Sequence, residues 1–231
     1  MILSRNQIFT VVCNIRIPQA DGGEKIGTGI FIEKDNKCYL VTAEHVARDT
    51  DINAYIIYCD TLSNPLTRKL TVLNPNLSWK HHPTADISCL EIDIGNNFDL
   101  LNGRCYPYTQ IEFNTNTITR DEEITCVGFP RGLGVAGKFT PFTFRSFFSS
   151  NLVTFPRFDT NVPCDFLCLE NPSVGGYSGG PVFDLGYRIV GAMTTTTSDT
   201  RLYGLIHGTL GDKTGGKIAA VTPITYLNDI I

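Results

Sequence analysis

Short runs of apolar and β-branched residues recur along the whole chain, and turn-forming residues separate them. Gly, Asn, Asp and Pro bound most of these runs, as in residues 20–23 and 34–37. Runs of this length and spacing predict an all-β barrel or sandwich rather than alternating strands and helices. The predicted strands span residues 8–17, 29–33, 38–42, 54–59, 87–92, 124–128, 167–169, 180–183, 189–194, 202–206 and 217–222.

Helical periodicity is confined to two segments. Residues 43–48 predict one helical turn directly after a strand. Residues 223–231 begin with a proline and space apolar residues three to four apart, which predicts a short C-terminal helix. Between the two halves, residues 96–118 are rich in Asn, Thr and Gly and predict a connection.

Composition narrows the classes of protein. The chain has 231 residues, of which 42% are hydrophobic and 18% charged, so it can bury a core. A net charge of −4 without a basic block gives no support for binding nucleic acid or an anionic membrane. There is no apolar run long enough to span a membrane. Residues 1–6 lack the basic and apolar regions of a secretion signal, so we expect a cytoplasmic protein.

The eight cysteines are an even number, which is compatible with disulfides. Five of them nevertheless lie inside apolar strand-like runs, where a free thiol behaves as a small hydrophobe, so we expect reduced thiols. Cys164 and Cys168 lack paired C-x-x-C spacing, and His81 and His82 are distant in sequence, so we expect no metal. Nothing in the sequence indicates a cofactor. The cysteines are Cys13, Cys38, Cys59, Cys89, Cys105, Cys126, Cys164 and Cys168.

A serine hydroxyl lies in a glycine-rich run at residues 174–183, Val-Gly-Gly-Tyr-Ser-Gly-Gly-Pro-Val-Phe. A serine becomes a strong nucleophile only beside a base that a third group orients. His45 is the candidate base for Ser178, because histidine titrates near neutral pH. Asp86 is the candidate orienting group, and the backbone N–H groups of Gly176 and Ser178 are the candidate oxyanion hole.

These segments resemble those of the trypsin-like (chymotrypsin-fold) serine peptidases, especially the bacterial HtrA-like branch. The catalytic residues have the same order along the chain, His45, Asp86, Ser178. The resemblance is carried by residues 27–32, 41–46, 85–90 and 176–181, and more weakly by 187–194.

The resemblance implies one peptidase domain over residues 1–231, without a PDZ domain. It implies two six-stranded antiparallel β-barrels, at residues 7–95 and 119–222, with the connection at 96–118 and the helix at 223–231. The active site would lie between the barrels. The implied activity is that of a serine endopeptidase that forms an acyl-enzyme and acts on a protein or peptide.

Two residues depart from the family pattern. Glu44 replaces the small residue common before the histidine, and we expect it to face solvent. Tyr177 stands where zymogen-activated members carry Asp, so we expect no trypsin-like zymogen switch. Tyr177 would instead pack structurally and hold the oxyanion loop.

The resemblance also implies a specificity pocket lined by Pro172 and the strand Thr194-Thr195-Thr196. Glu170 is the nearest acidic residue in the sequence, and none of the lining residues is charged. The pocket is therefore expected to accept a small or medium uncharged side chain.

Three alternatives remain. An α/β-hydrolase would use Asp199 and His207 after the serine, but Gly-Gly-Pro at residues 179–181 starts a strand better than a helix. We therefore expect His207 to be a loop residue. A protease fold retained as a latent binding or scaffold module is the second alternative. The third keeps the enzyme and adds a protein activator that orders residues 175–177.

Overall fold

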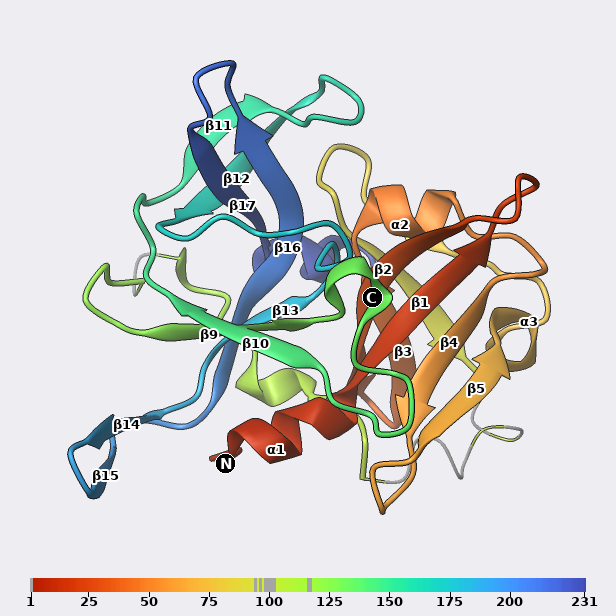
Figure 1. Ribbon diagram of the computed structural model, residues 1–231, viewed down its shortest axis with the longest axis horizontal. Coiled ribbons are helices and arrows are strands. Elements are labelled where there is room, and N and C mark those ends of the chain that lie inside the picture. Colours follow the sequence, from red (N-terminus) through yellow and green to blue (C-terminus); the bar gives the residue numbers. More distant parts are fainter. Residues whose placement is uncertain (1, 94, 96, 98–102, 116–117) are drawn as a thin grey trace.

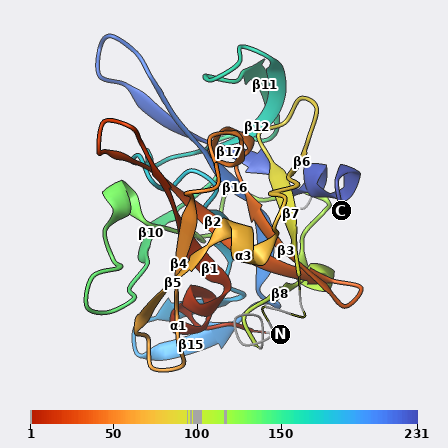
Figure 2. The same ribbon diagram turned by 90° about the vertical axis from the view of Figure 1, so that its right-hand side faces the viewer.

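Two β-sheets lie side by side in the computed structural model of the chain, which describes residues 2–93, 95, 97, 103–115 and 118–231. In Figure 1 the first sheet, from the N-terminal half, lies on the right, and the second lies on the left. Figure 2 turns the first sheet toward the viewer. The predicted all-β, two-part architecture is confirmed.

The first sheet has eight strands, in the order β5-β4-β1-β2-β3-β7-β6, with β8 pairing in parallel to β2. Its central β2–β3 hairpin turns at Asp35 and Asn36, which both have positive φ, as a tight hairpin turn requires. The strands are β1 (Val12–Pro18), β2 (Glu24–Lys34), β3 (Lys37–Thr42), β4 (Tyr55–Cys59), β5 (Pro65–Lys69), β6 (Lys80–His81), β7 (Ser88–Ile92) and β8 (Tyr106–Pro107).

The second sheet has seven strands, in the order β10-β9-β13-β16-β17-β12-β11. The prediction had six strands in each half, and no pairing among the described residues closes either sheet into a barrel. The strands are β9 (Ile124–Gly128), β10 (Phe142–Ser146), β11 (Val153–Pro156), β12 (Pro163–Leu169), β13 (Pro181–Asp184), β16 (Arg201–Gly211) and β17 (Lys217–Pro223).

A separate two-stranded sheet, β14 (Tyr187–Val190) and β15 (Met193–Thr196), projects from the body of the protein at the lower left of Figure 1. The sequence predicted a single strand over residues 189–194. The chain instead turns back between the two strands, where Gly191 has a φ of +62°.

Helices are short. The predicted turn at residues 43–48 is α2 (Glu44–Arg48), and the C-terminal helix is a 3-10 helix, η5 (Ile224–Asp229). The predicted strand at residues 8–17 begins later, because Ser4 and Gln7 form a capping box that starts a helix there. No helix in the described ranges is long and apolar enough to cross a membrane. The other helices of the described residues are α1 (Arg5–Ile8), η1 (Phe9–Val11), α3 (Leu70–Leu73), η2 (Tyr108–Gln110) and η4 (Pro130–Gly132).

The largest apolar cluster joins the two sheets. It contains fully buried Ile30 and Val41 from the first sheet and Val127 and Phe183 from the second. Burial of apolar area between the sheets therefore fixes how they pack. The predicted connection lies partly outside the described residues, at 96, 98–102 and 116–117, as does residue 94 of the predicted first barrel.

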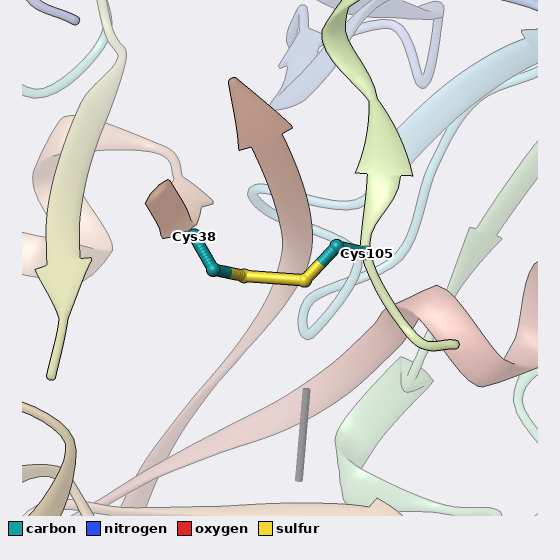
Figure 3. Close-up of a disulfide and its surroundings, with 2 residues drawn as sticks. All are labelled: Cys38 and Cys105. Atoms are coloured by element: carbon teal, nitrogen blue, oxygen red, sulfur yellow. A yellow bond between two sulfur atoms is a disulfide. The ribbon is translucent and has the colours of Figure 1, made fainter. Parts of the chain in front are cut away.

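The expectation of reduced thiols is wrong at Cys38, which forms a disulfide with Cys105 (Figure 3). On β3, Cys38 lies opposite Glu33 of β2, and the parallel pairing of β8 with the end of β2 places Cys105 beside it. The other six cysteines are free and buried. Disulfides are rare in the reducing cytoplasm, so this one gives no support to the expected cytoplasmic location.

Replacing Gly179 with alanine is expected to destabilise the protein by about 3 kcal/mol or more. Its φ is +80°, and an added Cβ would collide with Thr28, Thr42 and Ala43 of the first sheet. Gly22 is the matched control, with a φ of +84° and open space around it, so Gly22→Ala is expected to cost about 1 kcal/mol. Urea unfolding measures both; equal losses would show that the close contact between the sheets contributes nothing.

Candidate active site

The end of β3 and the start of α2 position His45. Its Nδ1 lies 2.8 Å from Asp86 Oδ2, and its backbone N–H donates to Asp86 Oδ1 at 2.9 Å. That N–H lies in the first turn of α2, where backbone donors lack an acceptor within the helix, so Asp86 satisfies it. The structure thus brings His45 and Asp86 into direct contact through two hydrogen bonds.

The carboxylate of Asp86 is fully buried just before β7. Besides His45, it accepts from Arg157 Nη2 on Oδ1 at 3.1 Å and from His207 Nδ1 on Oδ2 at 2.5 Å. Burial alone would raise the pKa of Asp86, but the hydrogen bonds from His207 and His45 outweigh burial and hold this pKa well below its usual range. Asp86 is therefore an anion at neutral pH.

The sequence expectation for His207 is wrong, because the residue lies inside β16 and is completely buried. The register of β16 against β17 shifts between Ile206 and Gly208, so His207 is the extra residue of a β-bulge. Bulges re-aim side chains, and this one points the imidazole at Asp86. Nothing in the local sequence signals that contact.

Ser178 lies on the tight turn that leads into β13. Its Oγ donates to the backbone carbonyl of His207 at 3.3 Å, and its own carbonyl accepts from Thr28 N–H at 2.8 Å. Among the described residues, Ser178 forms no hydrogen bond with His45. His207 lies beside both residues: its ring centroid is 5.8 Å from that of His45, and its carbonyl accepts from Ser178 Oγ.

Two backbone donors remain unused around Ser178. The carbonyl of Gly175 accepts from the Arg131 N–H at 2.8 Å. In a trans peptide the C=O and N–H bonds point in opposite directions, so the N–H of Gly176 points away from Arg131. Within the described part of the chain, neither this N–H nor that of Ser178 has an acceptor. Gly176 has a φ of +102°, and a Cβ there would strike Phe129 and Arg131.

Tyr177 is buried, and its ring meets Phe144 edge-on at 5.1 Å between centroids. Burial raises the pKa of this phenol to about 12, so it is neutral. The residue next to Ser178 therefore anchors the turn by packing against the second sheet.

The expectation that Glu44 faces solvent is wrong. Its residue exposure is 8%, and Oε2 lies 2.5 Å from Arg157 Nη2. Arg157, just after β11, also pairs with Asp159 at 2.7 Å, while Arg48 bonds both Glu44 and Asp159. A cluster of two arginines and three carboxylates, Asp86 included, thus connects the two sheets.

A cavity of about 510 Å³ opens beside Ser178. The prediction for its walls fails, because Thr194, Thr195 and Thr196 are exposed on the separate β14–β15 hairpin, and Pro172 is exposed beside the cavity lining. The second-sheet strands β16 and β17 supply the wall instead. The lining residues are Phe158, Ser173, Val174, Gly175, Ser178, Gly208, Thr209, Gly211 and Lys217.

Two side-chain groups have the spacing of metal ligands: His45 with Asp86 and His207, and Glu44 with Asp86 and Asp159. In the first group both imidazoles bond to the carboxylate. In the second, the guanidinium of Arg157 already supplies the positive charge. Internal hydrogen bonds therefore account for both groups.

Two packed β-sheets with this topology define a chymotrypsin-like fold. The family model of the trypsin-like peptidase domain matches residues 27–191, and the chain belongs to that family of serine proteases. No curated protein sequence matches the chain.

Solved structures share the fold at low sequence identity. The apo MamO protease domain from Magnetospirillum magneticum has a TM-score of 0.65 at 14% identity, covering 98% of both chains. The active form of the Rv3671c protease from M. tuberculosis has a TM-score of 0.63 at 16% identity, covering 97% of this chain and 81% of that one. The HtrA-type protease AlgW with a tripeptide has a TM-score of 0.61 at 17% identity. This chain is covered over 98% and spans 62% of the AlgW chain.

Replacing Arg157 with methionine is expected to lower the free energy of unfolding by about 3–5 kcal/mol, because it leaves the buried charge of Asp86 without a cation and Glu44 with only the half-exposed Arg48. Arg145 is the control: it pairs with Glu123 on the surface, so Arg145→Met is expected to cost less than about 1 kcal/mol. Urea denaturation at neutral pH measures both. A similar small loss in the two variants would mean that the buried cluster is not stabilising.

Proposed function

We propose that this protein is a serine endopeptidase in which Ser178 is the nucleophile, His45 the general base and Asp86 the group that orients the base. The observation that carries this proposal is the double hydrogen bond between His45 and the buried Asp86. It fixes the imidazole with its proton on Nδ1, which leaves Nε2 free to accept one.

The first half of the reaction acylates the serine. The Ser178 hydroxyl turns about one bond, from the His207 carbonyl toward His45 Nε2, and gives up its proton as Oγ attacks a peptide carbonyl. The unused N–H groups of Gly176 and Ser178 stabilise the negative oxygen that forms. His45 then passes the proton to the leaving amine, and the C–N bond breaks.

In the second half water attacks the acyl ester. His45 takes a proton from the water and returns it to Ser178 Oγ when the acid product leaves. A peptide substrate is supported by the neighbouring AlgW structures, which hold a tripeptide and a decapeptide.

A latent module, or an enzyme that requires a protein activator, is the competing proposal. The favouring observation is that Ser178 Oγ is hydrogen-bonded to His207 rather than to His45. The peptide between Gly175 and Gly176 argues against a required activator. The Arg131 N–H already bonds the carbonyl of this peptide, so no second protein is needed to orient it.

The purified protein is expected to react with a fluorophosphonate probe, because an activated serine attacks phosphorus as it attacks a carbonyl. Ser178→Ala and His45→Ala should abolish labelling and lower kcat/KM toward peptides by about 10³-fold or more. The measurement is gel fluorescence after labelling, with circular dichroism to verify folding.

Mutation of His81 provides the control, since this exposed histidine bonds Ser88 and does not line the cavity beside Ser178. His81→Ala should label like the wild type. A folded wild type that stays unlabelled alone but reacts after addition of a cell extract would favour an activator. One that never reacts would favour the latent module.

The cavity beside Ser178 supports a preference for substrates with an acidic side chain. Lys217 is its only charged lining residue, and no ion pair of Lys217 occurs within the described ranges. The pocket expected from the sequence was uncharged, because Lys217 was not among its predicted lining residues. The pairing of β17 with β16 brings Lys217 opposite Gly211.

Peptides with Glu at the P1 position, the residue that contributes the attacked carbonyl, are expected to be cleaved about three- to fivefold faster than those with Gln. Lys217→Glu should reverse the preference toward Lys. Lys213→Glu in the same hairpin is the control, with an equal change in net charge away from the cavity lining. A P1 library measures all three, and equal rates for Glu and Gln in the wild type would contradict the assignment.

A further inference from the structure

We propose that His207 is a positioning residue: its imidazole holds Asp86 while its backbone carbonyl holds Ser178. This inference rests on the proposed function, because it concerns how the groups assigned to that reaction are kept in place. The side chain of His207 forms no hydrogen bond with Ser178 among the described residues, and only its backbone carbonyl reaches the nucleophile.

The side chain of His207 completes the hydrogen bonding of Asp86. Oδ2 accepts from Nδ1 of both His207 and His45, and Oδ1 accepts from the backbone N–H of His45 and from Arg157. With two donors on each oxygen, the carboxylate has a single favourable orientation. Without the His207 donor, Oδ2 would keep only its hydrogen bond from His45 in a buried site, and the carboxylate would be free to rotate.

Among the described residues, Asp86 bonds one nitrogen of the His207 imidazole, and the other nitrogen has no partner. Asp86 can only accept, so the proton of His207 lies on Nδ1 and its Nε2 carries a lone pair. This Nε2 is buried without a hydrogen-bond partner among the described residues, and Phe158 and Phe166 lie 4.4 and 4.8 Å from the imidazole by centroids. A proton on Nε2 would therefore be a buried charge with nothing to bond.

The titratable and charged groups around the contact of His207 with Asp86 come from three elements. They are Asp86 before β7, His45 on α2 and Arg157 after β11, and the last is tied to Glu44 and Asp159. A second buried cation next to Arg157 would be unfavourable.

The backbone of the same residue acts on the nucleophile. Because His207 is the bulge residue of β16, its carbonyl is available to Ser178 Oγ while its side chain reaches Asp86. His207 of the second sheet thus contacts both the carboxylate of Asp86, from the first half of the chain, and the hydroxyl of Ser178.

Two substitutions separate the hydrogen bond from packing. His207→Asn places an amide N–H near the position of Nδ1, and His207→Phe fills the site without a donor. We expect His207→Phe to lower kcat/KM by about 10- to 100-fold and His207→Asn by only a few-fold. Probe labelling and circular dichroism show whether each variant folds with a reactive serine.

The pH profile of kcat/KM gives a readout that packing alone would not move. With one donor fewer, the Asp86 carboxylate attracts a proton on His45 more strongly, so His207→Phe should shift the acid limb to higher pH. His207→Asn should restore the wild-type limb. A lower rate for His207→Phe with an unchanged acid limb would overturn the positioning role.

Proton NMR of the ¹⁵N-labelled protein tests the contact without depending on hydrolysis. Two low-field imidazole N–H signals are expected, and His207→Asn should remove one and leave the other. A single signal, or a proton on His207 Nε2, would overturn the proposal even in an active enzyme. Two signals in a folded protein that neither reacts with the probe nor hydrolyses peptides would instead refute the proposed function. The role of His207 in that reaction would then be refuted as well.

Discussion

The buried negative charge of Asp86 is the constraint on which the site depends. A carboxylate removed from water is costly unless donors surround it, and here four donors do so. They come from α2 in the first half of the chain and from β16 and the segment after β11 in the second. Satisfying this charge therefore requires both sheets to be folded and packed against each other.

The same requirement explains residues that depart from the family pattern. Glu44 is buried because it bonds Arg157 Nη2, the same nitrogen that bonds Asp86, and a guanidinium has more N–H donors than Asp86 alone can satisfy. Asp159 and Arg48 extend the pairing to the surface. Ion pairs of this kind contribute little net stability, but they penalise any arrangement that separates their members. The cluster thus favours one packing of the sheets over others.

Similarity to known proteases at 14–17% identity shows how little of this fold depends on particular side chains. Alternation of apolar residues and the placing of glycines at close contacts, such as Gly179 against the first sheet, suffice for the architecture. The surroundings of the candidate site depend on particular side chains. In this chain they include His207 on a bulge, a lysine on the cavity wall and a threonine-rich hairpin directed away from it.

The sequence alone determined the strand-rich class, the two-part order of the chain and the candidates His45, Asp86 and Ser178, because strand periodicity and glycine-rich turns are local signals. It also predicted α2, which follows its strand directly. Only the tertiary structure decided what surrounds Asp86, since Arg157 and His207 reach it from positions 71 and 121 residues away. The cavity wall and the Cys38–Cys105 disulfide were likewise settled by strand pairing. Contacts between distant strands depend on register and bulges, which no local pattern encodes.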